Sequence, residues 1–418
     1  DKANLVGFDL TTSLNAGLQG GTDDTVINSL GLSRRLDVLN YSESLAIAYQ
    51  NKSKKVRNYV EQEICDRLDV AALKLISTKN SNSKELTALH DQVKLEIKKS
   101  LPVVHDLSVS PDVSKRRKAA IVLRNASHDE SSTILYRLIR DLNEETKSEA
   151  VVTAALNVHV ELAISIVEML SDSRFGNVAF AALKRMGDSV LDVLEVSFYK
   201  TGVDQLTQMK LIELIGCCET KKAVKVLYKK ISYPHRLIVF AAIEQLEMRN
   251  SAVDGDSEYM LLNVLNELIG SIALIISIRN FIDENIEHSK LLASALDREL
   301  SNNFARLFSV LKLLYDAKSV SYVEENLKDG SPESIGFAME LMELFISENL
   351  KPKLFPLFED ISHSNKIKKL ADYFPIEHVN EENFLRVILS HDITEISSWS
   401  KCVAMHTQTD AIRRWFDS

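Results

Sequence analysis

Side chains able to do chemistry occur in this sequence, but their spacing matches none of the common catalytic or metal-binding patterns. Ten histidines are spread over the 418 residues, without an HExxH zinc motif. There is also no GxSxG nucleophile motif, no GxxxxGKS/T phosphate loop and no GxGxxG nucleotide motif. His159 falls between two expected helices, where a loop or capping role is favoured over metal binding. We therefore expect no catalytic residue, no cofactor and no metal.

The four cysteines indicate the redox state of the protein's compartment and do not indicate a metal site. Cys65, Cys217, Cys218 and Cys402 show neither a CxxC nor a Cys/His spacing typical of zinc. We expect them to be packed or partly exposed thiols. So few cysteines fit a reducing compartment, and we expect a cytoplasmic location.

One basic cluster is the candidate partner-binding patch: Lys115, Arg116, Arg117 and Lys118. Basic residues on an amphipathic helix usually form a solvated face. The functional alternative is contact with an acidic partner, anionic headgroups or phosphate. The net charge of -9 disfavours a dedicated nucleic-acid binder, and both tryptophans lie near the C-terminus, which disfavours an aromatic, basic groove for damaged DNA.

The elements that position these residues are expected to be helices throughout. Only 13 Gly and 7 Pro occur, and 45% of the residues are hydrophobic, which favours long helices over sheets. Between residues 115 and 250, an apolar helix, a short turn and a second apolar helix recur about every thirty residues, a period typical of α-solenoids. Alanine pairs recur at matching places, where small side chains let helices approach closely. These pairs lie at 119–120, 154–155, 181–182 and 241–242. The predicted fold is an all-α solenoid of HEAT-like helical repeats with an irregular helical N-terminal part.

Three parts are expected along the chain. Residues 1–112 form a helical N-terminal unit or cap with a flexible lead-in, and residues 113–250 form the regular repeats. Residues 251–418 continue the solenoid as irregular C-terminal helical repeats. Within the first part a long helical region is predicted over about 54–78, because apolar residues recur there every three or four positions and form one stripe.

The most apolar stretch, 268–278, is shorter than the about 20 residues that a membrane span needs. We therefore expect a buried core helix. It belongs to the first of two long helices predicted at 257–285 and 288–315. Another helix is predicted to begin at Ser331 and Pro332, because Ser is a favoured N-cap and Pro is favoured at the first helical position.

Five segments of the C-terminal half share a pattern of apolar spacing with a few fixed polar residues. They are LDRELSNNFARL at 296–307, LKLLYD at 311–316, SPESIGFAMEL at 331–341, LKPKLFPL at 350–357 and SWSKCVA at 398–404. Together they resemble the soluble HEAT-repeat portion that follows the membrane domain in bacterial proteins similar to ATP/ADP translocases. The resemblance is best over about 175–406, and residues 1–110 match it poorly.

The resemblance implies a cytoplasmic appendage that binds a partner, supports assembly or regulates the transporter. The family's transport chemistry belongs to its membrane domain, so no transport residue is assigned here. We expect a non-enzymatic interaction domain at the cytoplasmic face of the inner membrane. Its partner would be another protein or the membrane domain of the parent chain, and direct membrane contact stays open. Because the chain begins at Asp1, we expect a fragment or a processed product. Two alternatives remain: a HEAT-like enzyme acting on nucleic acid or a small ligand, and a soluble adaptor scaffold.

Overall fold

The fold is all-α. The structure is a computed structural model that describes residues 10–36, 39–79, 84–249, 253, 255–285, 290–380, 382–392 and 395–417. Within those ranges every regular element is a helix and no strand occurs, which confirms the expected class. The chain divides into two compact units, Asp1–Glu219 (unit 1) and Thr220–Ser418 (unit 2). This division falls inside the stretch 113–250 that the sequence groups as regular repeats, and the predicted three-part organisation stays a prediction.

The first helices of unit 1 pack around a core of their own. They are α1 (Leu10–Gln19), α2 (Asp23–Leu36), α3 (Tyr41–Ala48), α4 (Lys54–Arg67), α5 (Val70–Lys79) and α6 (Lys84–Ser100). α3 packs against α1, α2, α4 and α5, while α6 covers α4 and α5. Ile121 and Val122 from the following helices belong to the same core, so these six helices are joined to the rest of unit 1 by apolar packing.

The helical region predicted over 54–78 consists of two helices, because the chain breaks between α4 and α5. Leu68 has a φ of 47°, in the left-handed region that ends helices. The Asp69 side chain accepts a hydrogen bond from the Ala72 N–H at 2.9 Å and so caps α5. Both helices bury their apolar residues in one core, which is why the apolar periodicity continues across the break.

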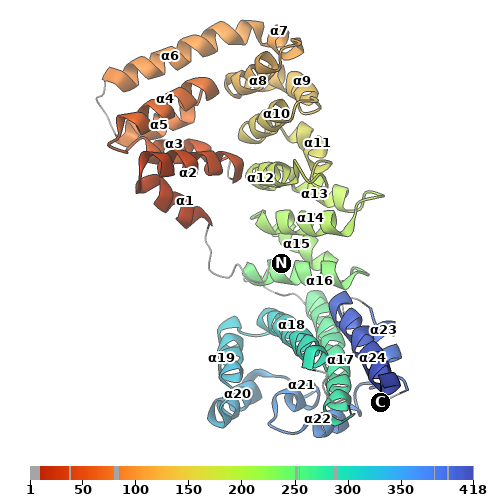
Figure 1. Cartoon of the computed structure of the whole chain (residues 1–418). Helices are drawn as coiled ribbons and strands as arrows, with labels where there is room; N and C mark the ends of the chain where they lie inside the picture. Colours follow the sequence, from red (N-terminus) through yellow and green to blue (C-terminus); the bar gives the residue numbers. More distant parts are fainter. Residues whose placement is uncertain are drawn as a thin grey trace. The chain divides into compact units, whose positions relative to one another are not determined.

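The remaining helices of unit 1 follow one another in pairs. They are α7 (Val104–Val109), α8 (Val113–Val122), α9 (His128–Leu138), α10 (Glu144–Leu156), α11 (Ala163–Val167), α12 (Gly176–Met186), α13 (Leu191–Phe198) and α14 (Gln205–Cys217). Short 3-10 turns accompany them: η1 (Leu101–Val103), η2 (Leu123–Asn125), η3 (Val160–Leu162) and η4 (Gly187–Val190). α8, α10, α12 and α14 pack in one row, with α9, α11 and α13 beside them (Figure 1). The alanine pairs at 119–120 and 154–155 are fully buried, as close packing of this row requires.

Unit 2 is built on two long helices. Its helices are α15 (Lys221–Lys230), α16 (Arg236–Met248), α17 (Gly255–Asn285), α18 (Lys290–Leu314), α19 (Ala317–Asp329), α20 (Pro332–Phe345), α21 (Lys351–Phe358), α22 (His363–Leu370), α23 (Phe384–Ser390) and α24 (Ser398–Asp417). α17 packs along α18, and the two are also covered by α16, α22 and α24. The two predicted long helices are confirmed. The predicted start of α20 is confirmed as well, since Ser331 Oγ accepts from the Ser334 N–H at 3.2 Å.

α17 carries the most apolar stretch of the chain. Over Gly255–Ile282 it is long and apolar enough to cross a membrane by length and composition, and a buried core helix meets the same test. Here 72% of the apolar window is buried inside the protein. Ile269, Ile272 and Ile275 are fully buried, as expected for a core helix.

Candidate functional site

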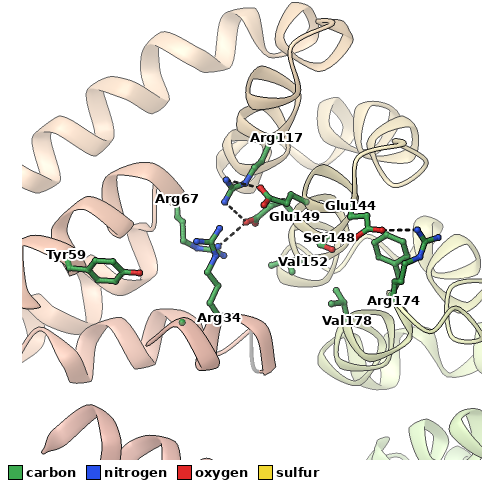
Figure 2. Close-up of a pocket in the computed structure, with 13 residues that line it drawn as sticks. Arg34, Tyr59, Arg67, Arg117, Glu144, Ser148, Glu149, Val152, Arg174 and Val178 are labelled. Atoms are coloured by element: carbon green, nitrogen blue, oxygen red, sulfur yellow. Dashed lines mark hydrogen bonds and ion pairs between the residues drawn. The ribbon is translucent and has the colours of Figure 1, made fainter. Parts of the chain in front are cut away.

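Unit 1 holds an open cleft between its N-terminal helices and its helix row. α2 and α4 form one side, and α8, α10 and α12 form the other (Figure 2). The cavity has a volume of about 570 Å³. Its lining is dominated by charge, and we call it the arginine cleft after four of its residues: Arg34, Arg67, Arg117 and Arg174.

Glu149 lies at the centre of this charge. It stands early on α10, directly before the apolar run AVVTAAL, and its side chain is 7% exposed. Arg67 Nη1 lies 3.0 Å from Glu149 Oε1, and Arg117 Nη2 lies 3.6 Å from the same oxygen. Arg124 Nη2 binds the second oxygen, while Arg124 Nε donates to Thr153 Oγ1 at 3.2 Å. One buried carboxylate is therefore shared by three guanidinium groups.

The arginines keep Glu149 ionised. Burial alone would raise the pKa of this carboxyl, because desolvation disfavours the charged form. The charges of Arg124, Arg67 and Arg117 outweigh burial and lower the pKa of Glu149 to about 2. A carboxyl with this pKa is a permanent anion at neutral pH, so its role is to hold the arginines and not to transfer protons.

The arginines retain unused hydrogen-bonding capacity. Arg67 is 3% exposed, and its guanidinium also lies 5.1 Å from the centre of the Tyr41 ring. Nε of Arg67 and Nε of Arg117 are buried and have no hydrogen-bond partner within the described part of the chain. A buried donor without a partner costs about 1–3 kcal/mol.

Two glutamates at the outer edge of the cleft form exposed ion pairs with its arginines. Arg117 Nη1 lies 3.3 Å from Glu145 Oε2, whose side chain is 68% exposed. Arg174 Nη1 lies 2.8 Å from Glu144 Oε1, in a pair whose two side chains are 62% and 58% exposed. Exposed ion pairs contribute little to stability, so an entering carboxylate can replace these glutamates.

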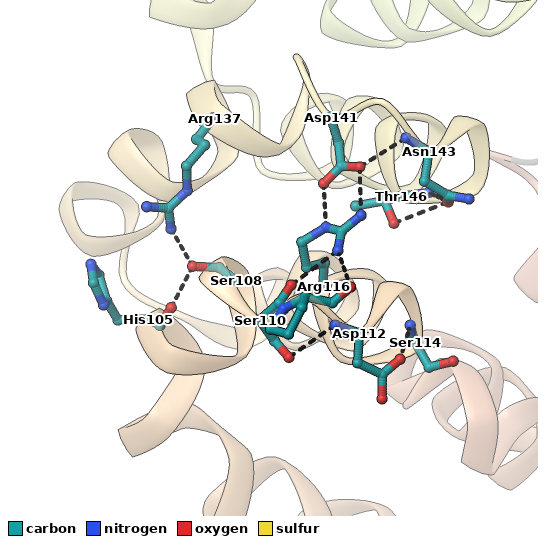
Figure 3. A network of polar contacts seen from close by, with 11 residues as sticks. His105, Ser108, Ser110, Asp112, Ser114, Arg116, Arg137, Asp141, Asn143 and Thr146 are labelled. Atoms are coloured by element: carbon teal, nitrogen blue, oxygen red, sulfur yellow. Dashed lines mark hydrogen bonds and ion pairs between the residues drawn. The ribbon is translucent and has the colours of Figure 1, made fainter.

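The predicted basic patch does not form one surface. Arg117 lines the arginine cleft, and Arg117 and Lys118 together line an adjoining pocket, where Lys118 pairs with Glu96. Lys115 is exposed. Arg116 is directed elsewhere, into a polar network (Figure 3). Four consecutive residues of a helix are distributed around its axis, so all four cannot share one face, although the first and the fourth can.

Arg116 is a structural residue that joins α8 to the turn after α9. Its Nε lies 2.7 Å from Asp141 Oδ2 and its Nη2 lies 3.1 Å from Asp141 Oδ1 (Figure 3). Its Nη1 also donates to the carbonyl oxygens of Ser110 and Pro111, both at 2.9 Å. Asp141 Oδ1 accepts from the Asn143 N–H at 2.8 Å, which orders the start of α10. Sequence reasoning treated Arg116 and Arg117 alike, whereas the structure gives them different roles.

The remaining cleft residues were not singled out from the sequence. Arg34, Arg67 and Arg174 are far apart in the chain and come from α2, α4 and the turn before α12. The one available signal was Glu149, an ionisable residue directly before an apolar helical run, because a charge in that position needs a buried partner. His159, also discussed from the sequence, lies in the expected loop between α10 and η3 and is fully buried.

A scan against protein-family models and a search of curated proteins find no match to this chain. The resemblance described above therefore rests on the residues that carry it. The helix packing and the arginine cleft are the features of the molecule that bear on its function.

Proposed function

We propose that this chain is a non-enzymatic α-solenoid of HEAT-like repeats whose arginine cleft binds an acidic segment of a partner protein. The observation that carries the proposal is the excess of positive charge in the cleft, where four arginines and three glutamates line the cavity and three guanidinium groups share the single carboxylate of Glu149. Carboxylates are the acceptors that guanidinium groups bind most strongly, often through two parallel hydrogen bonds.

The packing of unit 1 supports the solenoid part of the proposal. α8 packs on α10, α10 on α12 and α12 on α14, while α11 packs on α13. Each helix pair therefore contacts its neighbours in sequence, as repeats in a solenoid do. Such stacks offer extended surfaces for a partner.

The ion pairs in the cleft favour binding over catalysis. Glu144, Glu145 and Glu149 each pair with an arginine, and only the pair of Glu149 is buried. A general base needs a carboxylate or imidazole with a pKa near the working pH. Glu149 instead has a pKa of about 2, which suits an anchor for guanidinium groups.

The proposal is tested with the whole chain and a fluorescent peptide rich in Asp and Glu. Fluorescence anisotropy should show binding that weakens as salt is added, and a peptide with Asn and Gln in place of the acids should bind at least about tenfold more weakly. The double variant R34A/R174A removes two cleft cations that stand on the surface side. It should lower the affinity for the acidic peptide by at least about tenfold.

Lys200 provides the matched control. Its Nζ lies 2.9 Å from Glu168 Oε1 in an exposed ion pair outside the cleft, so K200A should bind the acidic peptide like the unmodified chain. Equal binding of the acidic and neutral peptides would rule out the proposed role of the cleft. Tighter binding of duplex DNA than of the acidic peptide would favour the nucleic-acid alternative.

The nature of the partner is the second part of the proposal. The residues between 296 and 404 that resemble the translocase-associated portion suggest an integral membrane protein as the partner. An affinity-tagged chain should then co-purify with an integral membrane protein after detergent extraction of its own cells. Recovery with water-soluble proteins alone would leave the adaptor scaffold as the function.

A further inference from the structure

Three side chains with metal-ligating atoms converge in unit 1, away from the residues that line the arginine cleft. His159 Nδ1 lies 2.9 Å from Glu161 Oε1, and His128 Nε2 lies 3.8 Å from the same oxygen. One ligand atom from each of the three residues lies within 4.8 Å of the others. The two imidazole rings stack with their centroids 4.1 Å apart.

The chain reaches this arrangement through a strained turn. α10 ends at Leu156, and Val158 then adopts a φ of 54°. A β-branched residue in this left-handed region is a true outlier and costs on the order of 1–3 kcal/mol. The turn is held by the His159 N–H, which donates to the Ala154 carbonyl at 2.9 Å. It brings the buried His159 and the more exposed Glu161 up to the first residue of α9, His128.

Ser131 orients the His159 ring. Its hydroxyl donates to the His128 carbonyl at 2.9 Å and lies 2.9 Å from His159 Nε2. A hydroxyl carries one proton, so Ser131 Oγ accepts from Nε2–H when its own proton is given to the carbonyl. In this tautomer the bond is of the kind by which metal-binding histidines are oriented, and the Nδ1 lone pair is directed at Glu161.

Two acceptors then face one another. His159 Nδ1 and Glu161 Oε1 are 2.9 Å apart, and the Ser132 hydroxyl, which lies 3.0 Å from Nδ1, donates to the same Glu161 oxygen. A proton or a cation between nitrogen and oxygen is needed to make this contact favourable. His128, whose side chain is 52% exposed, adds a second imidazole at the same place.

We propose that His128, His159 and Glu161 bind a transition-metal dication of the zinc type through two imidazole nitrogens and one carboxylate. Two histidines and a carboxylate are a donor set that zinc uses in proteins. At zinc–ligand distances of about 2.0–2.2 Å, ligand atoms in a tetrahedral site lie roughly 3.3–3.5 Å apart. The observed 2.9 Å and 3.8 Å lie on either side of this range, and the exposed His128 ring is free to adjust. Three protein ligands leave a fourth position for water.

The test is calorimetric titration of the whole chain, freed of metal by a chelator, with Zn²⁺ alone. One zinc ion per chain should bind, and Co²⁺ in its place should give the visible absorption of a tetrahedral site. H128A and E161Q should each weaken Zn²⁺ binding by at least about tenfold to hundredfold, because mutating a residue that only orients a metal ligand already has an effect of that size. Both side chains are exposed enough for these variants to keep the fold, which circular dichroism verifies.

His105 gives the control, because it is an exposed histidine of the same unit on α7. H105A should bind Zn²⁺ like the unmodified chain. S131A should keep one zinc ion per chain with affinity lowered about tenfold to hundredfold, which identifies Ser131 as a positioning residue. Folded H128A and E161Q that bind Zn²⁺ unchanged, or an unmodified chain that gives only the spectrum of hydrated Co²⁺, would overturn the site and leave a proton in the His159–Glu161 contact.

Discussion

Two buried glutamates, one in each unit, show how differently this protein handles charge in its interior. Glu299 of α18 is 9% exposed and accepts from the Ser397 N–H at 3.1 Å and the Ser400 hydroxyl at 2.7 Å. These neutral donors attach the start of α24 to α18. Glu149 of α10 is equally buried but is surrounded by three guanidinium groups.

The difference separates a structural carboxylate from one that organises a site. Ser397 and Ser400 satisfy Glu299 within unit 2. Around Glu149 the cations outnumber the carboxylate, and two of their Nε atoms have no partner among the described residues. Excess positive charge with free donors costs stability, and proteins tend to accept that cost where a ligand binds. Removing one charge at a time tests this difference between the two carboxylates.

The largest effect is expected for E149Q. The change leaves Arg67 and Arg124 buried without their counter-charge, and breaking a buried pair in this way costs about 3–5 kcal/mol. E299Q is the matched change, and it should cost only about 1 kcal/mol because the Gln oxygen can still accept from Ser397 and Ser400. Urea unfolding followed by circular dichroism measures both free energies. Equal losses of unfolding free energy in E149Q and E299Q would mean that the charge of Glu149 does not distinguish it from Glu299.

Much of the fold could be predicted because a helix can be recognised from the residues of its own segment. The apolar periodicity predicted helices between 113 and 250, and the Ser331-Pro332 pair predicted the start of α20. The break between α4 and α5 was missed because it depends on one left-handed residue, Leu68, and one cap, Asp69. Neither disturbs the apolar pattern, so periodicity could not show them.

The candidate site was far less predictable, because its residues meet only after folding. Arg67 and Glu149 are far apart in the sequence and come into contact when the N-terminal helices pack beside α10. His128 and Glu161 are brought together by the positive φ of Val158, which no local pattern indicates. The basic patch at 115–118 was visible in the sequence, but helix geometry sends its members in different directions.

Lowering the pH should destabilise the protein through protonation of Glu149, with an effect somewhat smaller than that of E149Q. Its pKa is lowered from 4.5 to about 2 by the arginines, so the folded state holds its proton less tightly than the unfolded state. The resulting stability, on the order of 3 kcal/mol, is fully present above about pH 4.5 and is lost as the pH falls toward 2. The free energy of unfolding, measured by urea titration across this range, should therefore fall less steeply in E149Q than in the unmodified chain. Parallel curves would place the acid sensitivity elsewhere.

The smallest effects on stability should separate the neighbours Arg116 and Arg117. R116A removes two bonds to Asp141 and two to backbone carbonyls, so we expect a loss of about 1.5–3 kcal/mol with binding of the acidic peptide unchanged. R117A removes one cation from an excess around Glu149, which offsets the lost ion pairs and should keep the cost below about 1 kcal/mol. The same variant should bind the acidic peptide at least about tenfold more weakly. Anisotropy measures peptide binding and urea unfolding measures stability in both variants. If Arg116 stabilises the fold and Arg117 binds the peptide, R116A should lose stability but not binding, whereas R117A should lose binding with little loss of stability. If R117A were the less stable variant and still bound the peptide normally, the charge around Glu149 would be structural, like that of Glu299.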